Sequence, residues 1–362
     1  MKRKTFGIGA GVAAVAVVVW YGWREMGDPG AGAVRAVAKG GIAGKGVVRA
    51  ELSGTAERWP EFGTPEFGQV ARERVEAWLA SRGRDAAGLV GAWDITGDEA
   101  LLMEAAERFP GDPRVCVAMI WKLLGNGEDA AEWVDRLVAA EPQNPGALYL
   151  RAAAQHKAGA SKEAMATLRG AVALSGKLDL HLRDRMVTVR EAALASGAGV
   201  RDAAMLSILA PLSRGGGAPY LNGGHRVVAD GIKAAVAAGD AEEVTALAGI
   251  SLGMANQMAS APAPNLLDQL VENAWRRSTL KAMPGETEYG DSGTTVAQQL
   301  ERVEAKRSEV VAVVGALSRI GDWLPRASEA EVASYADTFL LRGELEAMKM
   351  ITAAGEKWGP GR

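Results

Sequence analysis

The side chains that could carry out chemistry are few in this sequence and lie far apart. The three histidines are His156, His181 and His225, and the single cysteine is Cys116. No two of them have the spacing of a metal pair, and the sequence contains no HExxH motif and no Cys/His cluster. Cys116 lies in an apolar run, without the neighbouring histidine that a nucleophile needs, so we interpret it as a small core residue. We expect no metal site and no catalytic residue that can be named from the sequence.

A phosphate-binding loop is also not indicated. Gly44-Lys45 has the dipeptide of a P-loop, but Lys39 stands where the first glycine belongs. Gly46 occupies the position at which a Ser or Thr must reach the metal, and no strand is predicted before it. The sequence also lacks a GxSxG motif. We therefore expect no cofactor.

The composition indicates a folded, helical protein. The chain has 362 residues, of which 48% are hydrophobic and 23% are charged, and its net charge is −3. A nucleic-acid-binding protein would need a basic face, so this charge argues against that class. Ala, Leu, Glu and Arg dominate after the first 25 residues, which predicts an all-α body. One cysteine excludes an intramolecular disulfide and leaves the redox compartment open.

The N-terminus has the pattern of a membrane anchor. Three basic residues in positions 1–4 precede an uncharged segment, Thr5 to Trp23, which as a helix spans about 28 Å. Aromatic residues gather at its far end, and the basic residues place the N-terminus in the cytoplasm. A cleaved signal peptide is the alternative, but the nearest cleavage tripeptide, Ala36-Val37-Ala38, lies far beyond the apolar segment. We expect a single-pass membrane protein with its body on the extracytoplasmic (periplasmic) side.

The remaining chain divides by composition and periodicity. Residues 24–63 are rich in Gly, Ala and Pro and are interpreted as a flexible linker. Helical periodicity begins at Thr64-Pro65, which predicts a helical repeat domain over 64–200 and a helical region over 201–362. The predicted helices are 65–83, 84–96, 98–109, 113–124, 128–140, 145–158, 161–174, 177–196, 201–212, 225–238, 240–259, 265–282, 294–319 and 328–356.

Residues 111–176 repeat themselves. Four pairs of residues recur at a spacing of 34, namely Ala118 and Ala152, Gly125 and Gly159, Ala130 and Ala164, and Val134 and Leu168. Small residues at a fixed period are typical of stacked helical hairpins, in which glycines turn the chain with positive φ. The segment resembles the tetratricopeptide-repeat (TPR) family, over about 70 residues well and about 130 loosely. The second copy carries Asn144-Pro145, Leu148, Ala152, Gly159, Glu163-Ala164, Leu168, Ala171 and Leu174, and the first carries Ala118, Gly125, Ala130 and Pro142. Gly176 stands where the family has a closing proline.

The resemblance implies a partner-binding surface. On the TPR pattern, the concave groove would be lined by Val115, Met119, Lys122, Tyr149, Ala153, His156 and Lys157. The subclass that clamps an acidic C-terminal peptide carries Lys and Asn at four of these positions, which are Val, Met, Tyr and Ala here, so that activity is not implied. The implied groove is apolar with a weakly basic edge, which suits a helix or an extended apolar peptide.

Two features of residues 201–362 allow alternatives. Val244 to Leu267 carries no charge, but its Asn, Gln and Pro residues favour a buried helix and a turn over a second membrane span. Residues 294–319 carry a heptad seam that could pair with a second copy of the chain or pack on the 328–356 helix, and we favour the second. The seam residues are Val296, Leu300, Val303, Arg307, Val310, Val314 and Leu317.

Taken together, the sequence predicts a membrane-tethered scaffold. Stacked hairpins present a rigid concave surface, and a tether raises the local concentration of a bound protein or peptide. One alternative is an enzyme whose site lies in residues 201–362, around the glycine-rich loop at 215–225. Another is a purely structural spacer with no specific partner. A pocket with perturbed ionisable groups near His225 would favour the enzyme, and an exposed apolar groove over Tyr149 would favour the scaffold.

Overall fold

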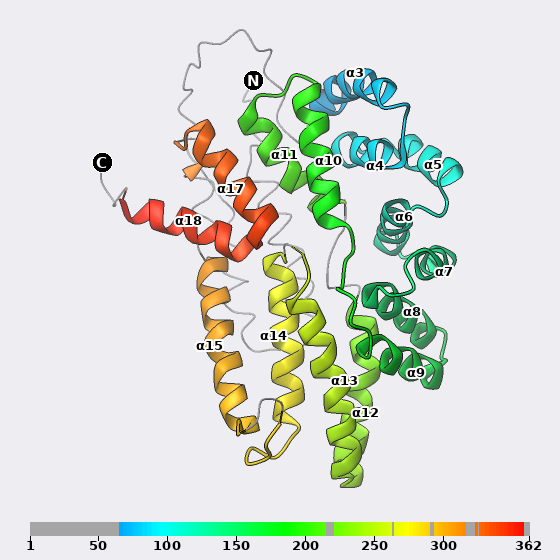
Figure 1. The fold of residues 1–362 in the computed structure, drawn as a ribbon, viewed down its shortest axis with the longest axis vertical. Coiled ribbons are helices and arrows are strands. Elements are labelled where there is room, and N and C mark those ends of the chain that lie inside the picture. Colours follow the sequence, from blue (N-terminus) through cyan, green and yellow to red (C-terminus); the bar gives the residue numbers. More distant parts are fainter. Residues whose placement is uncertain are drawn as a thin grey trace, which may run out of the picture. The chain divides into compact units, whose positions relative to one another are not determined.

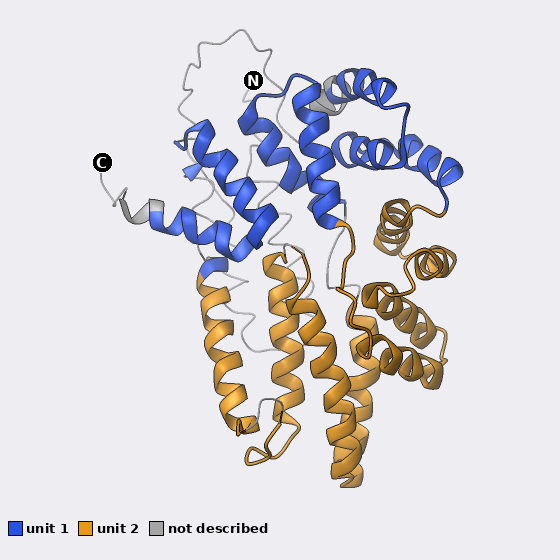
Figure 2. Cartoon of the chain, viewed as in Figure 1, with its two compact units in different colours: residues 1–110, 182–216, 313–362 blue, residues 111–181, 217–312 orange. Residues whose placement is uncertain are grey.

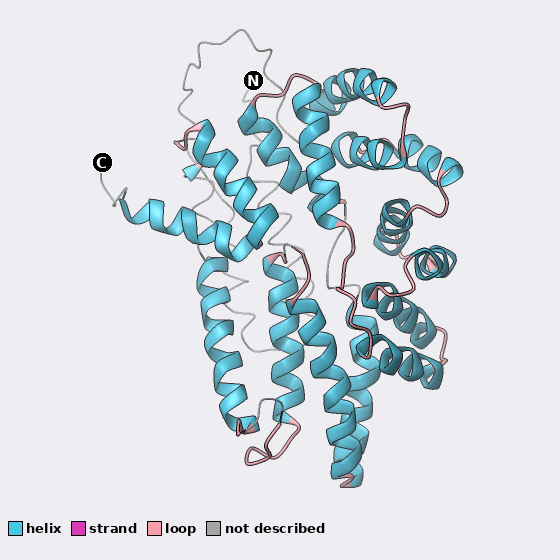
Figure 3. Cartoon of the chain, in the orientation of Figure 1, coloured by secondary structure: helices cyan, strands magenta, loops and turns pink. Residues whose placement is uncertain are grey.

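A computed structural model describes residues 65–214, 221–262, 264–289, 293–315, 323–324 and 326–357. Figure 3 shows that these residues form helices joined by short loops, with an isolated bridge between Glu288 and Thr295 and no strand within the described ranges. The predicted all-α class is confirmed. The predicted anchor at 5–23 and linker at 24–63 lie outside the described residues.

The helices are labelled in Figure 1. They are α3 (Pro65–Ser81), α4 (Ala86–Thr96), α5 (Glu99–Arg108), α6 (Pro113–Gly125), α7 (Ala131–Ala140), α8 (Pro145–Lys157), α9 (Ser161–Val172), α10 (Leu182–Ala195), α11 (Val200–Ser213), α12 (Asn222–Ala238), α13 (Ala241–Ala259), α14 (Leu266–Lys281), α15 (Val296–Gly315), α17 (Glu329–Arg342) and α18 (Glu344–Lys357).

Side-chain caps explain where several helices begin. Asp112 and Asn144 accept hydrogen bonds from the backbone N–H two residues later, and Pro113 and Pro145 then open α6 and α8. The cap satisfies one of the free N–H groups of the first turn, and proline removes another while fixing φ near its helical value. Ser328 with Glu331 forms a capping box at the start of α17.

Two of the predicted helices whose bounds differ in the structure are the 328–356 and 177–196 helices. The predicted 328–356 helix is broken into α17 and α18 at Gly343, whose φ of 90° lies outside the helical range. The predicted 177–196 helix begins only at Leu182. The chain before it is non-helical, and Asn144 donates from Nδ2 to the carbonyl oxygen of Asp179 there, at 2.6 Å.

The hairpins recur, but not with the predicted spacing. The first helices, α6 and α8, start 32 residues apart (145 − 113), and the second helices, α7 and α9, start 30 apart (161 − 131). Turning glycines with positive φ are Gly127 and Gly159, whereas Gly125 is still in α6. The spacing of 34 therefore pairs residues that are not structurally equivalent, and the array is an irregular set of helical hairpins.

The chain forms two compact units, coloured in Figure 2. Unit 1 comprises residues 1–110, 182–216 and 313–362, and unit 2 comprises residues 111–181 and 217–312. Both units draw on the predicted repeat domain and on the predicted C-terminal region. They are treated separately below.

In unit 1, α10 is the central helix. It packs on α4 and α11, and α11 in turn packs on α17, which forms a hairpin with α18. The turn between α3 and α4 places Arg84 at φ 54°, from where it donates to Glu104 of α5 at 2.9 Å from Nε and 2.5 Å from Nη2. These bonds to Arg84 hold the pKa of Glu104 down at about 2, so the pair fixes the turn on α5.

In unit 2, helices adjacent in sequence pack on one another from α6 to α9, and α12 packs on α8, α9 and α13. An apolar cluster joins α12 to α15, and Val296 and Val303 of the predicted seam are buried in it beside Leu280 and Met283. This part of the seam thus packs in the core of unit 2, with residues of α12, α13 and α14. Packing of the seam on the predicted 328–356 helix stays a prediction. Arg307 lies beside Glu304, at 3.9 Å.

None of the described helices is long and apolar enough to cross a membrane. The uncharged stretch from Val244 to Leu267 divides into the buried helix α13, a turn and the start of α14, as the sequence predicts.

Overpacking of the α8–α9 hairpin is a first testable prediction. Ala152 and Ala164 are fully buried, and the two helices pack closely along their lengths. We expect Ala152→Leu or Ala164→Leu to lower the free energy of unfolding by about 1–3 kcal/mol, because the added side chain has no space. Urea denaturation measures the change, with Ala158→Leu at the exposed end of α8 as a control. Stabilities equal to that of the control would contradict the close packing.

Candidate functional site: the inner face of α6 and α8

The predicted groove residues divide into a buried set and a surface set. Val115, Met119 and Tyr149 are buried, Lys122, Ala153 and His156 are half-buried, and Lys157 is exposed. All three residues of the buried set are thus core residues of the described chain. The helix starts also change the register, because Tyr149 of α8 is equivalent to Val117 of α6 and not to Val115.

Tyr149 is held by a helix from a distant part of the sequence. Its hydroxyl donates to Oε1 of Gln257 on α13. The amide of Gln257 donates in turn to the carbonyl oxygens of Ala171 and Leu174, at 3.1 and 3.0 Å, near the end of α9. Burial raises the pKa of the Tyr149 hydroxyl, which stays protonated and acts as a donor. Gln257 therefore connects both helices of the α8–α9 hairpin to α13.

Helix α12 covers the same face of α8. A Cβ on Gly223 would lie 2.8 Å from the Cβ of Ala153, and one on Gly224 would lie 3.1 Å from the backbone oxygen of Tyr149. Glycine is needed at both positions because the two helix backbones approach closely. The glycine-rich composition predicts a loop here, whereas in the structure these glycines lie in the first turn of α12. The face is thus occupied by a helix of the same chain.

The surface set has few specific contacts. Nδ1 of His156 lies 3.2 Å from Oγ of Ser161, which closes the turn between α8 and α9. Lys122 and Lys157 lie in the last turns of α6 and α8, where a cation interacts favourably with the helix dipole. Whether the seven residues bind a partner stays a prediction.

A buried polar network links α12, α13 and α14. Nε2 of His225 lies 3.0 Å from Oγ of Ser251, which lies 2.6 Å from Oγ1 of Thr279. The imidazole stacks on Trp275, with ring centroids 4.6 Å apart, and the indole N–H donates to Asn222 at 2.9 Å. Burial lowers the pKa of His225 to about 3, so the ring is neutral at physiological pH.

This network has the residue types of a Ser–His pair but the setting of a core. Ser251 and Thr279 are buried, and His225 is 7% exposed. A nucleophile must reach its substrate, and a general base works best with a pKa near the working pH. Neither condition holds for these side chains, so we interpret them as a hydrogen-bonded element that fixes the packing of α12 on α13 and α14.

A second polar cluster lies between α14 and α15. Glu272 is buried and accepts from Arg276 of its own helix and from Nζ of Lys306, at 2.9 Å. Arg277 donates to Glu304 at 2.5 Å. The Lys306–Glu272 and Arg277–Glu304 pairs join α15 to α14 and set the register of the two helices.

Cys116 is buried, as predicted, and burial raises its thiol pKa to about 11. A thiol with that pKa is protonated and unreactive at neutral pH. No group of three or more His, Cys, Asp or Glu side chains that could hold a metal ion occurs in the part of the chain that the structure describes.

A scan against models of protein families and searches of curated proteins and of solved structures found no match to this chain. The fold defines an all-α protein of packed helical hairpins.

Proposed function

We propose that this chain is a protein–protein interaction scaffold, tethered to a membrane through residues 5–23, with its helical body on the extracytoplasmic side. The proposal rests on the fold class, on the anchor pattern of the sequence and on one surface of unit 1. It implies that the buried polar networks serve packing and that the exposed face of a helix binds the partner.

The observation that carries the proposal is an apolar stripe on α10. Val187 is 39% exposed and Leu194 is 44% exposed, and the two lie seven residues apart on one face of the helix. Single exposed apolar residues are ordinary on a protein surface, whereas two on one helix face form the kind of stripe that a partner covers. Four of the other five large hydrophobic side chains exposed within the described ranges are also in unit 1, namely Met103, Val200, Leu341 and Met350.

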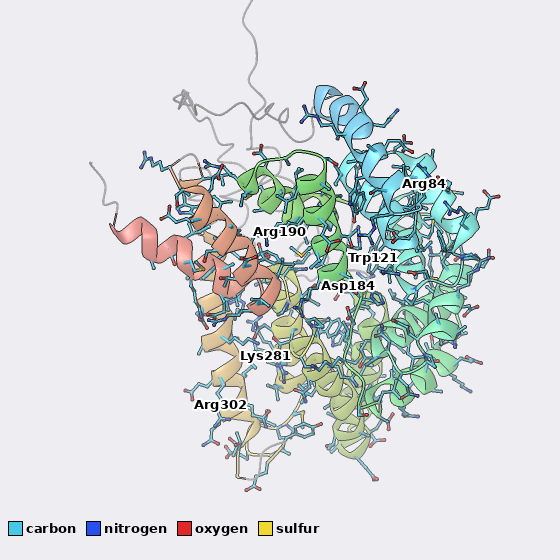
Figure 4. The ribbon with its side chains drawn as sticks, turned by 45° about the horizontal axis from the view of Figure 1, so that its top comes forward. Arg84, Trp121, Asp184, Arg190, Lys281 and Arg302 are labelled. Atoms are coloured by element: carbon cyan, nitrogen blue, oxygen red, sulfur yellow. The ribbon has the colours of Figure 1, made fainter. Side chains whose placement is uncertain are left out.

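Charged side chains lie on the same helix face, at the third and fourth positions after Val187. Between its two apolar residues, Arg190 forms an ion pair with Asp337 of α17, and Glu191 pairs with Arg82 at 3.2 Å (Figure 4 labels Asp184 and Arg190 along α10). An amphipathic helix carries an apolar stripe between charged edges, and such a helix is the partner that fits this surface. We therefore place binding on α10, and the predicted groove on α8 would bind a partner only if α12 moved away from it.

The test is crosslinking in native membranes with two variants of the full chain. We expect Val187→Asp with Leu194→Asp to reduce the crosslinked partner at least about tenfold, because charges replace the centre of the interface. Val236→Asp is the matched control, since Val236 is 50% exposed and lies on α12 in unit 2. If the double variant and the control crosslink as the parent does, α10 is not the binding surface.

The orientation has its own test. Protease added to spheroplasts should digest the helical body, because the basic residues at positions 2–4 keep only the N-terminus in the cytoplasm. A cytoplasmic marker protein in the same sample controls for leakage. A protected body would contradict the orientation, and release of a fragment that begins near Lys39 would contradict retention of the anchor.

A further inference from the structure

An ion pair in the core of unit 1 has a third charge beside it. Arg185 of α10 donates to both carboxylate oxygens of Asp94 on α4, at 3.0 Å from Nε and 2.5 Å from Nη2. The side chain of Asp94 is fully buried and that of Arg185 is 1% exposed. In this bidentate arrangement two N–H groups of the guanidinium face the two oxygens of the carboxylate, so the charges of Arg185 and Asp94 neutralise each other.

Arg214, at the end of α11, is the third charge. Its Nε is buried and has no hydrogen-bond partner among the residues that the structure describes. Its guanidinium lies over Gly97, the residue that ends α4 with a φ of 70°, and a Cβ at Gly97 would fall inside that group. The backbone there thus leaves room for the arginine. The carboxyl end of a helix is the negative end of its dipole, so the end of α4 attracts the guanidinium of Arg214. That helix end carries only a fraction of a negative charge.

The neighbouring carboxylates do not neutralise Arg214. Both oxygens of Asp94 accept from Arg185 and not from Arg214, and Asp98 accepts from the backbone N–H of Ala100 and from Arg72. Burial lowers the pKa of Arg214, the nearby charge of Asp94 raises it, and the charge of Arg185 lowers it further. Within the described ranges, two guanidinium groups therefore face one carboxylate, which leaves the charge of Arg214 without a bonded anion there.

We propose that Arg214 binds an oxyanion, which is a carboxylate or a phosphate. The positive charge of Arg185 adds to the electrostatic attraction of the anion. A guanidinium presents planar, paired N–H donors that match two oxygens of such an anion. The anion would complete the hydrogen bonds of Arg214 and balance the second positive charge of this part of unit 1.

The test measures thermal unfolding of the full-length protein in detergent, in sodium phosphate, sodium acetate or sodium chloride at equal ionic strength. We expect phosphate or acetate to raise the midpoint of the parent by about 2–4 °C over chloride, since a ligand that binds only the folded state stabilises it. The anion that gives the larger shift identifies the ligand chemistry. Arg214→Gln should lose the shift, and Arg201→Gln on the same helix should keep it.

Three outcomes would overturn the proposal: a parent that responds to neither anion beyond chloride, an Arg214→Gln variant that responds as the parent does, or an Arg201→Gln variant that also loses the shift. Arg214→Lys serves where Arg214→Gln does not fold. It keeps the charge and loses the paired donors, so its anion-dependent shift should fall to less than about half of the parent's.

Discussion

Replacing Arg185 by methionine should lower the free energy of unfolding by about 3–5 kcal/mol, because the carboxylate of Asp94 would stay buried without its bonded partner. The two side chains lie in the interior of unit 1, where α10 packs on α4, and both oxygens of Asp94 accept from Arg185. Methionine is unbranched and replaces much of the apolar stem of arginine. The fall in the free energy of unfolding therefore reports the lost charge and hydrogen bonds more than lost packing.

Arg190→Met is the matched control for this experiment. It changes the same residue type on the same helix, but Arg190 pairs with Asp337, whose side chain is 52% exposed. Solvent screens that pair, so its loss should cost less than about 1 kcal/mol. Urea denaturation of the purified protein measures both changes. Equal stabilities of the two single variants would show that the Asp94–Arg185 pair contributes no more than a surface pair.

The existence of the helices could be predicted because their signals are local. The dipeptides Asp112-Pro113 and Asn144-Pro145 each predict a helix start from two adjacent residues, and α6 and α8 begin at these prolines. The break at Gly343 was missed, because a glycine within a helical pattern is compatible with a continuous helix as well as with a cap. Only its backbone angle, which the surrounding fold sets, decides between the two.

The covered face of α8 could not be predicted, because it depends on which distant helix packs there. Gly223 and Gly224 belong to a glycine-rich stretch that indicates a loop by composition, yet they allow α12 to approach Ala153 and Tyr149. Arg185 gives no signal either, since an arginine in an amphipathic pattern is ordinarily placed at the surface. Its burial follows from Asp94, which lies 91 residues earlier in the chain.

Lowering the pH from 7 to 4 should destabilise the protein by about 3 kcal/mol through His225 alone. The ring is buried and its pKa is lowered to about 3, whereas an unfolded histidine has a pKa of about 6.5. Between these two values the unfolded chain binds a proton that the folded chain does not. The stability that the folded chain retains by keeping His225 neutral is therefore fully present above about pH 6.5, and it is lost as the pH falls towards 3.

His225→Phe isolates this effect. Phenylalanine keeps a ring to stack on Trp275, and Ser251 keeps its hydrogen bond to Thr279. The variant should be less stable than the parent at pH 7, because it loses the bond to Ser251, but its stability should fall less steeply in acid. Carboxylates whose pKa is lowered in the fold, such as Glu104 and Glu141, also lose stabilising interactions as the pH falls. They are present in both proteins, so the difference between the two pH profiles belongs to His225.

The measurement is the free energy of unfolding of the parent and of His225→Phe at pH 7, 6, 5 and 4. The two profiles should converge as the pH falls. Parallel profiles would show that the folded state accepts a proton at His225 as readily as the unfolded chain does. Water would then reach the ring, and the Ser251–His225 contact would have to be reconsidered as an accessible pair, which is the condition that the enzyme hypothesis requires.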